Sequence, residues 1–315
     1  MMLDTPSKGF QRSVRSDEHR VDLEVMADWL EACISFSSTR ISQRDIVDIL
    51  CEKQIYAEPE FAQERVADAW TTLRERKRKL GNALPYDFDQ FSLVRNKKPW
   101  SDCAPYSFLL TLSLSHHYPL WARGFGPDYT RQGELFEQIT EQAMVPLFPG
   151  WSVFRTGWSR NQPRSLSLLV GEIATRLNEV QGVVNRWSKP QAKEAGLDLL
   201  LWKDFEDPRG TYPVYLFQCA SGMDWEDKLT SPDLNLWTRL IDFRARGLPR
   251  KAFALPIVLS ADAYTRNANA VDGLVFDRLR IMSASRADPS WASRDLIRQM
   301  RAWGNPRTRA LPTYS

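Results

Sequence analysis

Apolar side chains recur at helical spacing through the first third of the chain. Their period predicts a helix over residues 21–36. Ser42 is a candidate cap for a second helix, and Pro59 begins a third, which Gly81 terminates. Residues 106–115 are continuously apolar apart from hydroxyls, which predicts a buried helix. This part of the chain is therefore expected to be mainly helical.

The pattern changes after Gly124 to Gly126, where glycine and Pro127 interrupt the helical period. Short apolar runs with the length of strands then alternate with amphipathic segments, which predicts an α/β arrangement. The expected helices are 132–145, 166–180 and 291–303, and the expected strands are 151–156, 197–202, 214–219 and 252–259.

These patterns divide the chain into three segments. Residues 1–20 are polar and mixed in charge, and we expect a disordered lead. Residues 21–125 form the mainly helical domain, and residues 126–315 form the α/β domain.

Composition narrows the function classes. The net charge is only +3 over 315 residues, so the chain is not a general nucleic-acid coat and needs a local basic surface to bind phosphates. Its four cysteines form no Cys-x-x-Cys pair, which argues against a zinc site or a disulfide framework. We see no signal-peptide pattern and no run long enough to span a bilayer, so we expect a cytoplasmic protein without a membrane partner.

Polar residues interrupt the apolar runs of the α/β segment at particular points. Asp198 begins an otherwise apolar run, where a carboxylate is unfavourable unless a cation or metal compensates it. Gln218 lies at the end of the next predicted strand and offers a carbonyl oxygen, a ligand type that suits Mg²⁺. Lys228 follows ten residues later. A helix that starts near Gly222 would place this lysine on its second turn, facing the strand end.

This order resembles the PD-(D/E)xK nuclease superfamily, which has the restriction-endonuclease-like fold. In that family a helix carries a Glu, a strand begins with a metal-binding Asp, and the next strand carries Glu or Gln followed by x and Lys. Glu137 matches the helix acid, Asp198 the strand Asp and Gln218 the Glu/Gln position. Ala220 stands where the lysine is expected, and Lys228 is the candidate for a relocated lysine.

The resemblance implies a mixed sheet flanked by helices and a site for Mg²⁺, or for Mn²⁺, held by Glu137, Asp198 and Gln218, with Lys228 as a catalytic cation. It implies an endonuclease acting on DNA, with RNA not excluded, of the kind found in bacterial phage-defence systems. It also implies a partner protein or a homo-oligomer. The alternative is an inactive nuclease-like subunit for nucleic-acid binding or assembly, which the Ala220 substitution would permit.

Each candidate also has a structural interpretation. Asp198 and Gln218 would then be solvated or inert strand-end residues, and Glu137 a surface residue of an amphipathic helix. Lys228 would be a surface lysine paired with Asp224 at i, i+4 spacing. Glu172 is a rival for the helix acid.

Basic residues and histidines outside the α/β segment are further candidates. The run from Arg74 to Lys79 is either a solvated helix face or a contact for the DNA backbone. His116 and His117 end an apolar helix, where histidines are usually structural. The basic residues in question are Arg74, Arg76, Lys77, Arg78 and Lys79.

Overall fold

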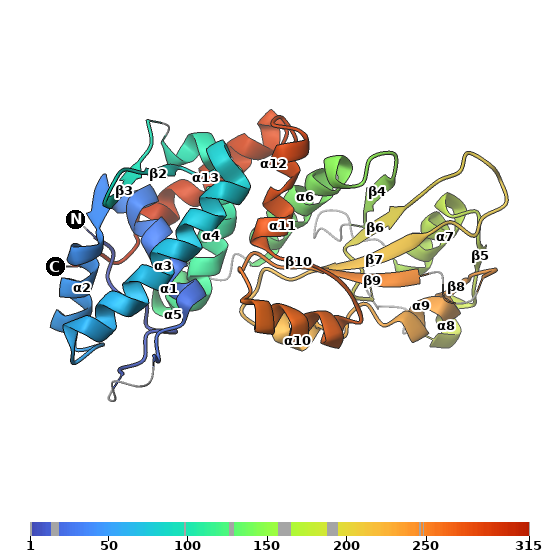
Figure 1. Ribbon diagram of the computed structural model, residues 1–315. Helices are drawn as coiled ribbons and strands as arrows, with labels where there is room; N and C mark the ends of the chain where they lie inside the picture. The colour runs from blue at the N-terminus through green and yellow to red at the C-terminus, as the bar shows by residue number, and fades with distance from the viewer. Residues whose placement is uncertain are drawn as a thin grey trace. The chain divides into compact units, whose positions relative to one another are not determined.

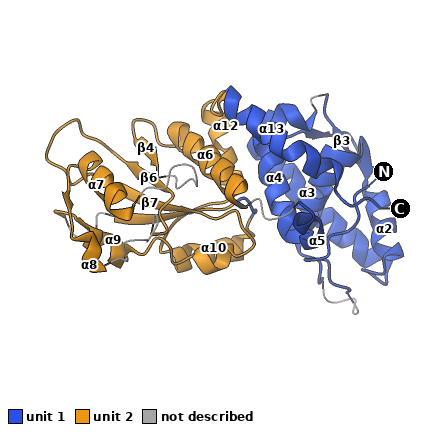
Figure 2. Ribbon diagram, turned by 180° about the vertical axis from the view of Figure 1, so that it is seen from behind, with its two compact units in different colours: residues 1–128, 256–258, 294–315 blue, residues 129–255, 259–293 orange. Residues whose placement is uncertain are grey.

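The computed structural model describes residues 2–13, 19–97, 99–125, 129–156, 165–187, 195–245, 247 and 249–314. The chain divides into two compact units (Figure 2). Unit 1 contains residues 1–128, 256–258 and 294–315, and unit 2 contains residues 129–255 and 259–293. The C-terminal helix thus belongs with the helical unit, whereas the sequence pattern grouped it with the α/β segment.

Helices dominate unit 1 (Figure 1). Asp22 caps the first helix through its side chain, and Ser42 forms a capping box with Asp45 at the second, as its spacing predicted. The helices are α1 (Leu23–Ala32), α2 (Gln43–Glu52), α3 (Pro59–Leu80), α4 (Ala104–His117), α5 (Pro119–Arg123) and α13 (Arg294–Arg309), with a π-helical turn at Cys33–Ser37 and 3₁₀ turns at Gly81–Ala83 and Trp100–Cys103.

A small antiparallel sheet in unit 1 was absent from the sequence prediction. In the described part of this unit it has the order β1-β3-β2. The first residues of the chain also differ from the expected disordered lead, because Leu3 is buried and bridges Thr313. The strands are β1 (Arg40–Ser42), β2 (Tyr86–Phe88) and β3 (Ser92–Arg95).

Unit 2 is built on a mixed sheet flanked by helices, as expected for an α/β protein. Among its described residues, five strands follow the order β10-β9-β7-β6-β4, with β4, β6 and β7 antiparallel and β7, β9 and β10 parallel. The strands are β4 (Ser152–Arg155), β6 (Leu199–Trp202), β7 (Val214–Cys219), β9 (Pro249–Ala254) and β10 (Gly273–Phe276).

Alternating side chains of this sheet make two different contacts. On one face, Leu200 and Leu216 join the apolar cluster formed with α7 and α9. On the other face, Phe217 and Phe276 stack near Phe148, which follows α6 directly. The helices of unit 2 are α6 (Tyr129–Leu147), α7 (Leu166–Arg176), α8 (Val184–Trp187), α9 (Leu234–Leu240), α10 (Ala261–Val271), α11 (Arg278–Met282) and α12 (Ala284–Ala287), with a 3₁₀ turn at Trp225–Lys228 and a short ribbon of β5 (Val180–Gln181) and β8 (Ile241–Asp242).

The predicted strand 214–219 coincides with β7, and 151–156 and 197–202 each contain an observed strand. The last predicted strand, 252–259, is displaced, because β9 already ends at Ala254 and Pro256 follows shortly after. Within the described ranges, no helix has the length and apolar character needed to cross a bilayer.

Candidate functional site

The start of β6 and the end of β7 lie side by side, and this register places Asp198 beside Gln218. Leu199 pairs with Phe217, and the Asp198 amide donates to the Phe217 carbonyl at 2.8 Å. The chain enters β6 through a tight turn in which Gly196 has φ +72°, a backbone conformation that glycine adopts without strain. The sequence therefore brings the candidate acid and the candidate amide to the same sheet edge.

Asp198 is held by direct hydrogen bonds to its carboxylate. Its Oδ2 accepts the Gln218 Nε2–H at 2.5 Å and the backbone N–H of Cys219 at 2.6 Å. The residue is only 8% exposed, so the structural interpretation of a solvated strand end is wrong. Two charge-assisted hydrogen bonds therefore fix the orientation of a buried carboxylate at this strand end.

The amide of Gln218 has a defined orientation. Its nitrogen faces Asp198, whereas its Oε1 lies toward Gly196, 3.4 Å from the place a Cβ would occupy there. In this orientation Gln218 positions Asp198. Rotation of the amide would turn its carbonyl oxygen toward the carboxylate, an arrangement that is favourable only with a cation between the two oxygens.

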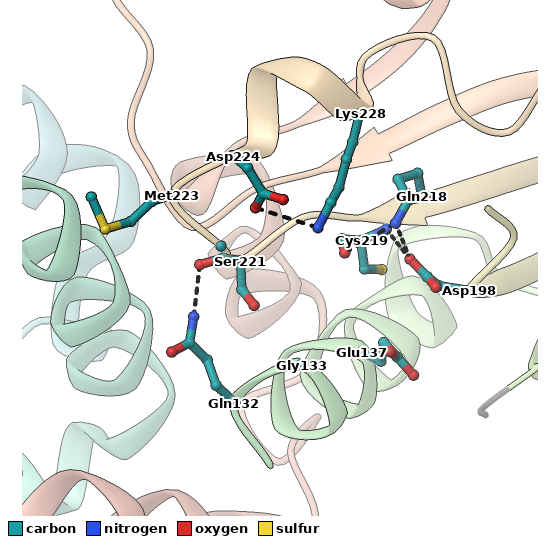
Figure 3. Close-up of a pocket in the computed structure, with 11 residues that line it drawn as sticks. Gln132, Gly133, Glu137, Asp198, Gln218, Cys219, Ser221, Met223, Asp224 and Lys228 are labelled. Carbon is teal, nitrogen blue, oxygen red and sulfur yellow. Dashed lines mark hydrogen bonds and ion pairs between the residues drawn. The ribbon is translucent and has the colours of Figure 1, made fainter. Parts of the chain in front are cut away.

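A cavity of about 520 Å³ lies over this strand end. Figure 3 shows Asp198 and Gln218 on one side of it, Glu137 projecting from α6, and Lys228 reaching from the 3₁₀ turn. On the opposite side, Gln132 of α6 donates to the Ser221 carbonyl at 2.8 Å. The structure therefore brings together all four residues that the resemblance selected: Glu137, Asp198, Gln218 and Lys228.

Glu137 shares its environment with a cation from the sheet. Arg155, the last residue of β4, lies with Nη1 3.6 Å from Glu137 Oε2 and with Nε 3.4 Å from Glu141 Oε2. Burial raises the pKa of Glu141, although Arg155 acts in the opposite direction. The rival Glu172 lies on α7, pairs with Arg176 at 2.8 Å and does not line this cavity.

The cluster of acids also acts on Cys219. Burial raises the pKa of its thiol well above the ordinary range, and the charges of Asp198, Glu137 and Glu141 raise it further. The three carboxylates therefore lie close enough to the Cys219 thiol to disfavour its ionised form.

The contacts of Lys228 agree with both interpretations, a cation of the cavity and a lysine paired with Asp224. Its Nζ lies 3.5 Å from Asp224 Oδ1 at i, i+4 spacing, and the same side chain lines the cavity. The expected helix near Gly222 is instead a 3₁₀ turn over Trp225–Lys228. Ala220, at the position of the expected lysine, is completely buried. The alanine therefore contributes a buried methyl group and no charge at this position.

The basic run of α3 is only partly a surface. Arg76 is 2% exposed and pairs with carboxylates of α1, so its expected contact with nucleic acid is wrong. Lys77 donates to the Tyr86 carbonyl and pairs with Asp87. The remaining cations of the run are exposed: Arg74, Arg78 and Lys79.

Of the two histidines, His117 lies in the interior of unit 1. His117 is 6% exposed, with Nε2 3.5 Å from Ser113 Oγ and 3.7 Å from Asp28 Oδ2. These contacts are all within unit 1.

Some residues in and next to the cavity were not selected from the sequence. Gln132 and Gly133 line the cavity, and Arg155 pairs with the lining residue Glu137. They belong to ordinary amphipathic patterns, and only the pairing of β4 with β6 and the packing of α6 on β4 bring them together. Within the part of the chain that the structure describes, no group of three or more His, Cys, Asp or Glu has the arrangement of a metal site. Any divalent ion here would thus rely on fewer carboxylates.

Comparison of the chain with family models, curated proteins and solved structures yields no match.

Proposed function

We propose that unit 2 is a Mg²⁺-dependent nuclease core that hydrolyses phosphodiester bonds of DNA. The observation that carries this proposal is the buried Asp198 carboxylate, oriented by Gln218 and Cys219 at a strand end. Glu137 and Lys228 line the same cavity. This arrangement supports the PD-(D/E)xK resemblance, since a helix acid, a strand-start Asp and a Gln on the adjacent strand converge.

The donor atoms fit a hard divalent cation. Mg²⁺ in proteins is usually held by one or two carboxylates, with water and substrate oxygens completing its shell. Asp198 and Glu137 supply the carboxylates, and Gln218 supplies an amide oxygen after rotation of its side chain.

When bound, Mg²⁺ would lower the pKa of a water molecule and offset the charge that develops on the phosphate. The protein groups have separate tasks in this scheme. Asp198 and Glu137 hold the ion, and Gln218 fixes the Asp198 rotamer. Lys228 stabilises negative charge on the reacting phosphate, and its replacement by alanine is expected to slow cleavage by about 10²-fold.

The direct test is cleavage of supercoiled plasmid in Mg²⁺ or Mn²⁺ by the wild type and by Asp198→Asn. Asparagine keeps a hydrogen-bond acceptor for Gln218 and Cys219 but removes the charge, so the fold should persist while cleavage disappears. Asp198→Ala provides a harsher version of the same change. Glu172→Gln is the matched control, because this acid lies in the same unit but does not line the cavity.

Cleavage that requires a metal, is lost in Asp198→Asn and survives in Glu172→Gln supports the proposal. Equal cleavage by the wild type and Asp198→Asn would refute the assigned site. RNA substrates tested in parallel separate the two nucleic acids.

The second candidate is an inactive nuclease-like subunit that binds nucleic acid or assembles with a partner. Two observations favour it: Ala220 replaces the motif lysine, and Lys228 pairs with Asp224. It predicts salt-sensitive DNA binding without cleavage in either metal. A role in phage defence, with a partner protein or a second copy of the chain, rests on the resemblance alone and belongs to both candidates.

A further inference from the structure

Arg155 occupies a place that no part of the proposed chemistry requires. It ends β4, and the following residue, Thr156, donates through its backbone N–H and its hydroxyl to the Asp198 carbonyl, both at 2.9 Å. The Arg155 guanidinium meanwhile pairs with Glu137 and Glu141 of α6. The end of β4 is therefore attached to both candidate metal-binding acids, to one through the backbone and to the other through a charge.

The contacts of Arg155 are those of a loosely held ion pair. They measure 3.4 and 3.6 Å, longer than the 2.7–2.9 Å of a tight charge-assisted hydrogen bond. The Arg155 side chain is 29% exposed and that of Glu137 is 20% exposed. The Arg155–Glu137 pair therefore lacks the short distance of a tight charge-assisted hydrogen bond, and solvent reaches both side chains.

The charges around the Arg155–Glu137 ion pair affect how strongly a metal could bind. Asp198, Glu137 and Glu141 all act on the Cys219 thiol, which shows that their charges are felt at one place. Arg155 is the cation that pairs with two of these acids. Its positive charge must repel a divalent cation and compete with it for Glu137.

We propose that Arg155 is a built-in competitor for the metal, which holds Glu137 in an ion pair and thereby weakens divalent-cation binding at the Asp198 site. This inference rests on the proposed function, because Glu137 matters as a ligand only if the cavity takes a metal. It adds a regulatory property: a group that draws Arg155 away from Glu137, such as a substrate phosphate, would increase the affinity of the site for the metal.

The test is Mn²⁺ binding to the full-length chain, measured by titration calorimetry without nucleic acid. Arg155→Gln removes the competing charge, and we expect the dissociation constant to fall on the order of tenfold. Arg155→Lys keeps the charge and should bind Mn²⁺ much as the wild type does. Arg131→Gln is the matched control, because it removes an arginine from an ion pair with Glu134, a carboxylate of α6 that does not line the cavity.

Glu141→Gln provides a change of opposite sign. Without Glu141, the Arg155 charge is directed to Glu137 alone, and one negative charge near the cavity is lost. Both effects weaken Mn²⁺ binding, so the dissociation constant should rise severalfold. Because this substitution is nearly isosteric, it carries the test even if Arg155→Gln folds poorly in a thermal melt.

The outcomes separate this inference from the proposed function. A wild type that binds no Mn²⁺ refutes the metal site itself, and the inference falls with it. A wild type that binds Mn²⁺ while Arg155→Gln binds equally or more weakly overturns the inference and leaves the metal site standing. Tighter binding by Arg155→Gln with weaker binding by Glu141→Gln supports it.

Discussion

Each unit of this protein places one arginine among helix carboxylates, and the two clusters differ in how they are closed. In unit 1, Arg76 is 2% exposed and lies 2.5–2.8 Å from the carboxylates of Glu24, Asp28 and Glu31. In unit 2, Arg155 is 29% exposed, lies 3.4–3.6 Å from its carboxylates and pairs with Glu137, which lines a cavity. Similar residue types therefore produce a sealed network in one place and an accessible one in the other.

Hydroxyl groups explain how the first cluster is sealed. Tyr86 and Tyr106 donate to Glu31 at 2.6 and 2.5 Å, and Ser113 donates to Asp28 at 2.5 Å. Tyr86 and Ser113 reach carboxylate oxygens that Arg76 does not contact, and Tyr106 shares Glu31 Oε2 with Arg76, so Glu31 and Asp28 each accept more than one hydrogen bond. Burial lowers the pKa of Arg76, but the carboxylates of Glu31 and Asp28 more than reverse this and raise it.

The sharpest way to break the comparison is Arg76→Met. It leaves buried carboxylates without their cation, and we expect the free energy of unfolding to fall by about 3–5 kcal/mol. Urea denaturation of the full chain, followed by circular dichroism, measures this. Arg78→Met is the control on the exposed side of the same helix and should change the free energy by no more than about 0.5 kcal/mol. A loss below about 1 kcal/mol for Arg76→Met would show that the network is dispensable.

A second substitution tests whether divalent cations stabilise the site of Asp198 and Gln218 in unit 2. Gln218→Glu replaces the amide that donates to Asp198 with a second carboxylate, so without divalent ions the hydrogen bond is lost and like charges meet. We expect a loss of about 1–3 kcal/mol in EDTA, which millimolar Mg²⁺ or Mn²⁺ should largely restore.

Thermal melts with and without the metal test this, with the wild type and Glu172→Gln as references. Equal destabilisation in EDTA and in Mg²⁺ would count against a cation between residues 198 and 218.

Local patterns were sufficient for much of unit 2. The run 214–219 predicted β7, and the apolar runs placed Asp198 before one strand and Gln218 at the end of the next, where the structure brings the two side chains together. Such contacts follow from the pairing of strands that are neighbours in sequence, which fixes the register over a short range.

Contacts between distant segments could not be read from the sequence in the same way. Arg76 lies in a run of exposed cations, and only the packing of α3 on α1 determines that it turns inward. Arg155 meets Glu137 because α6 packs on β4, a contact that the residue types alone do not reveal. Charges in a sequence therefore identify candidates, while the tertiary fold decides which of them are buried, paired or open.

The smallest expected effect concerns Gly133, a glycine within α6 that lines the cavity. A Cβ added there would meet no atom within 4 Å, so packing gives no reason for glycine. Gly133→Ala should therefore raise the free energy of unfolding by about 0.5–1 kcal/mol, because glycine is less favourable than alanine inside a helix.

Gly171→Ala in α7 is the matched control. Its Cβ would lie 3.0 Å from Gln181 Oε1, so we expect a smaller gain in the free energy of unfolding. If Gly133→Ala is more stable but cleaves more slowly, the helix surface at Gly133 is where the substrate approaches. If stability rises and cleavage is unchanged, this side of the cavity is not used. A loss of stability would mean that the α6 backbone at Gly133 is strained in a way that only glycine tolerates.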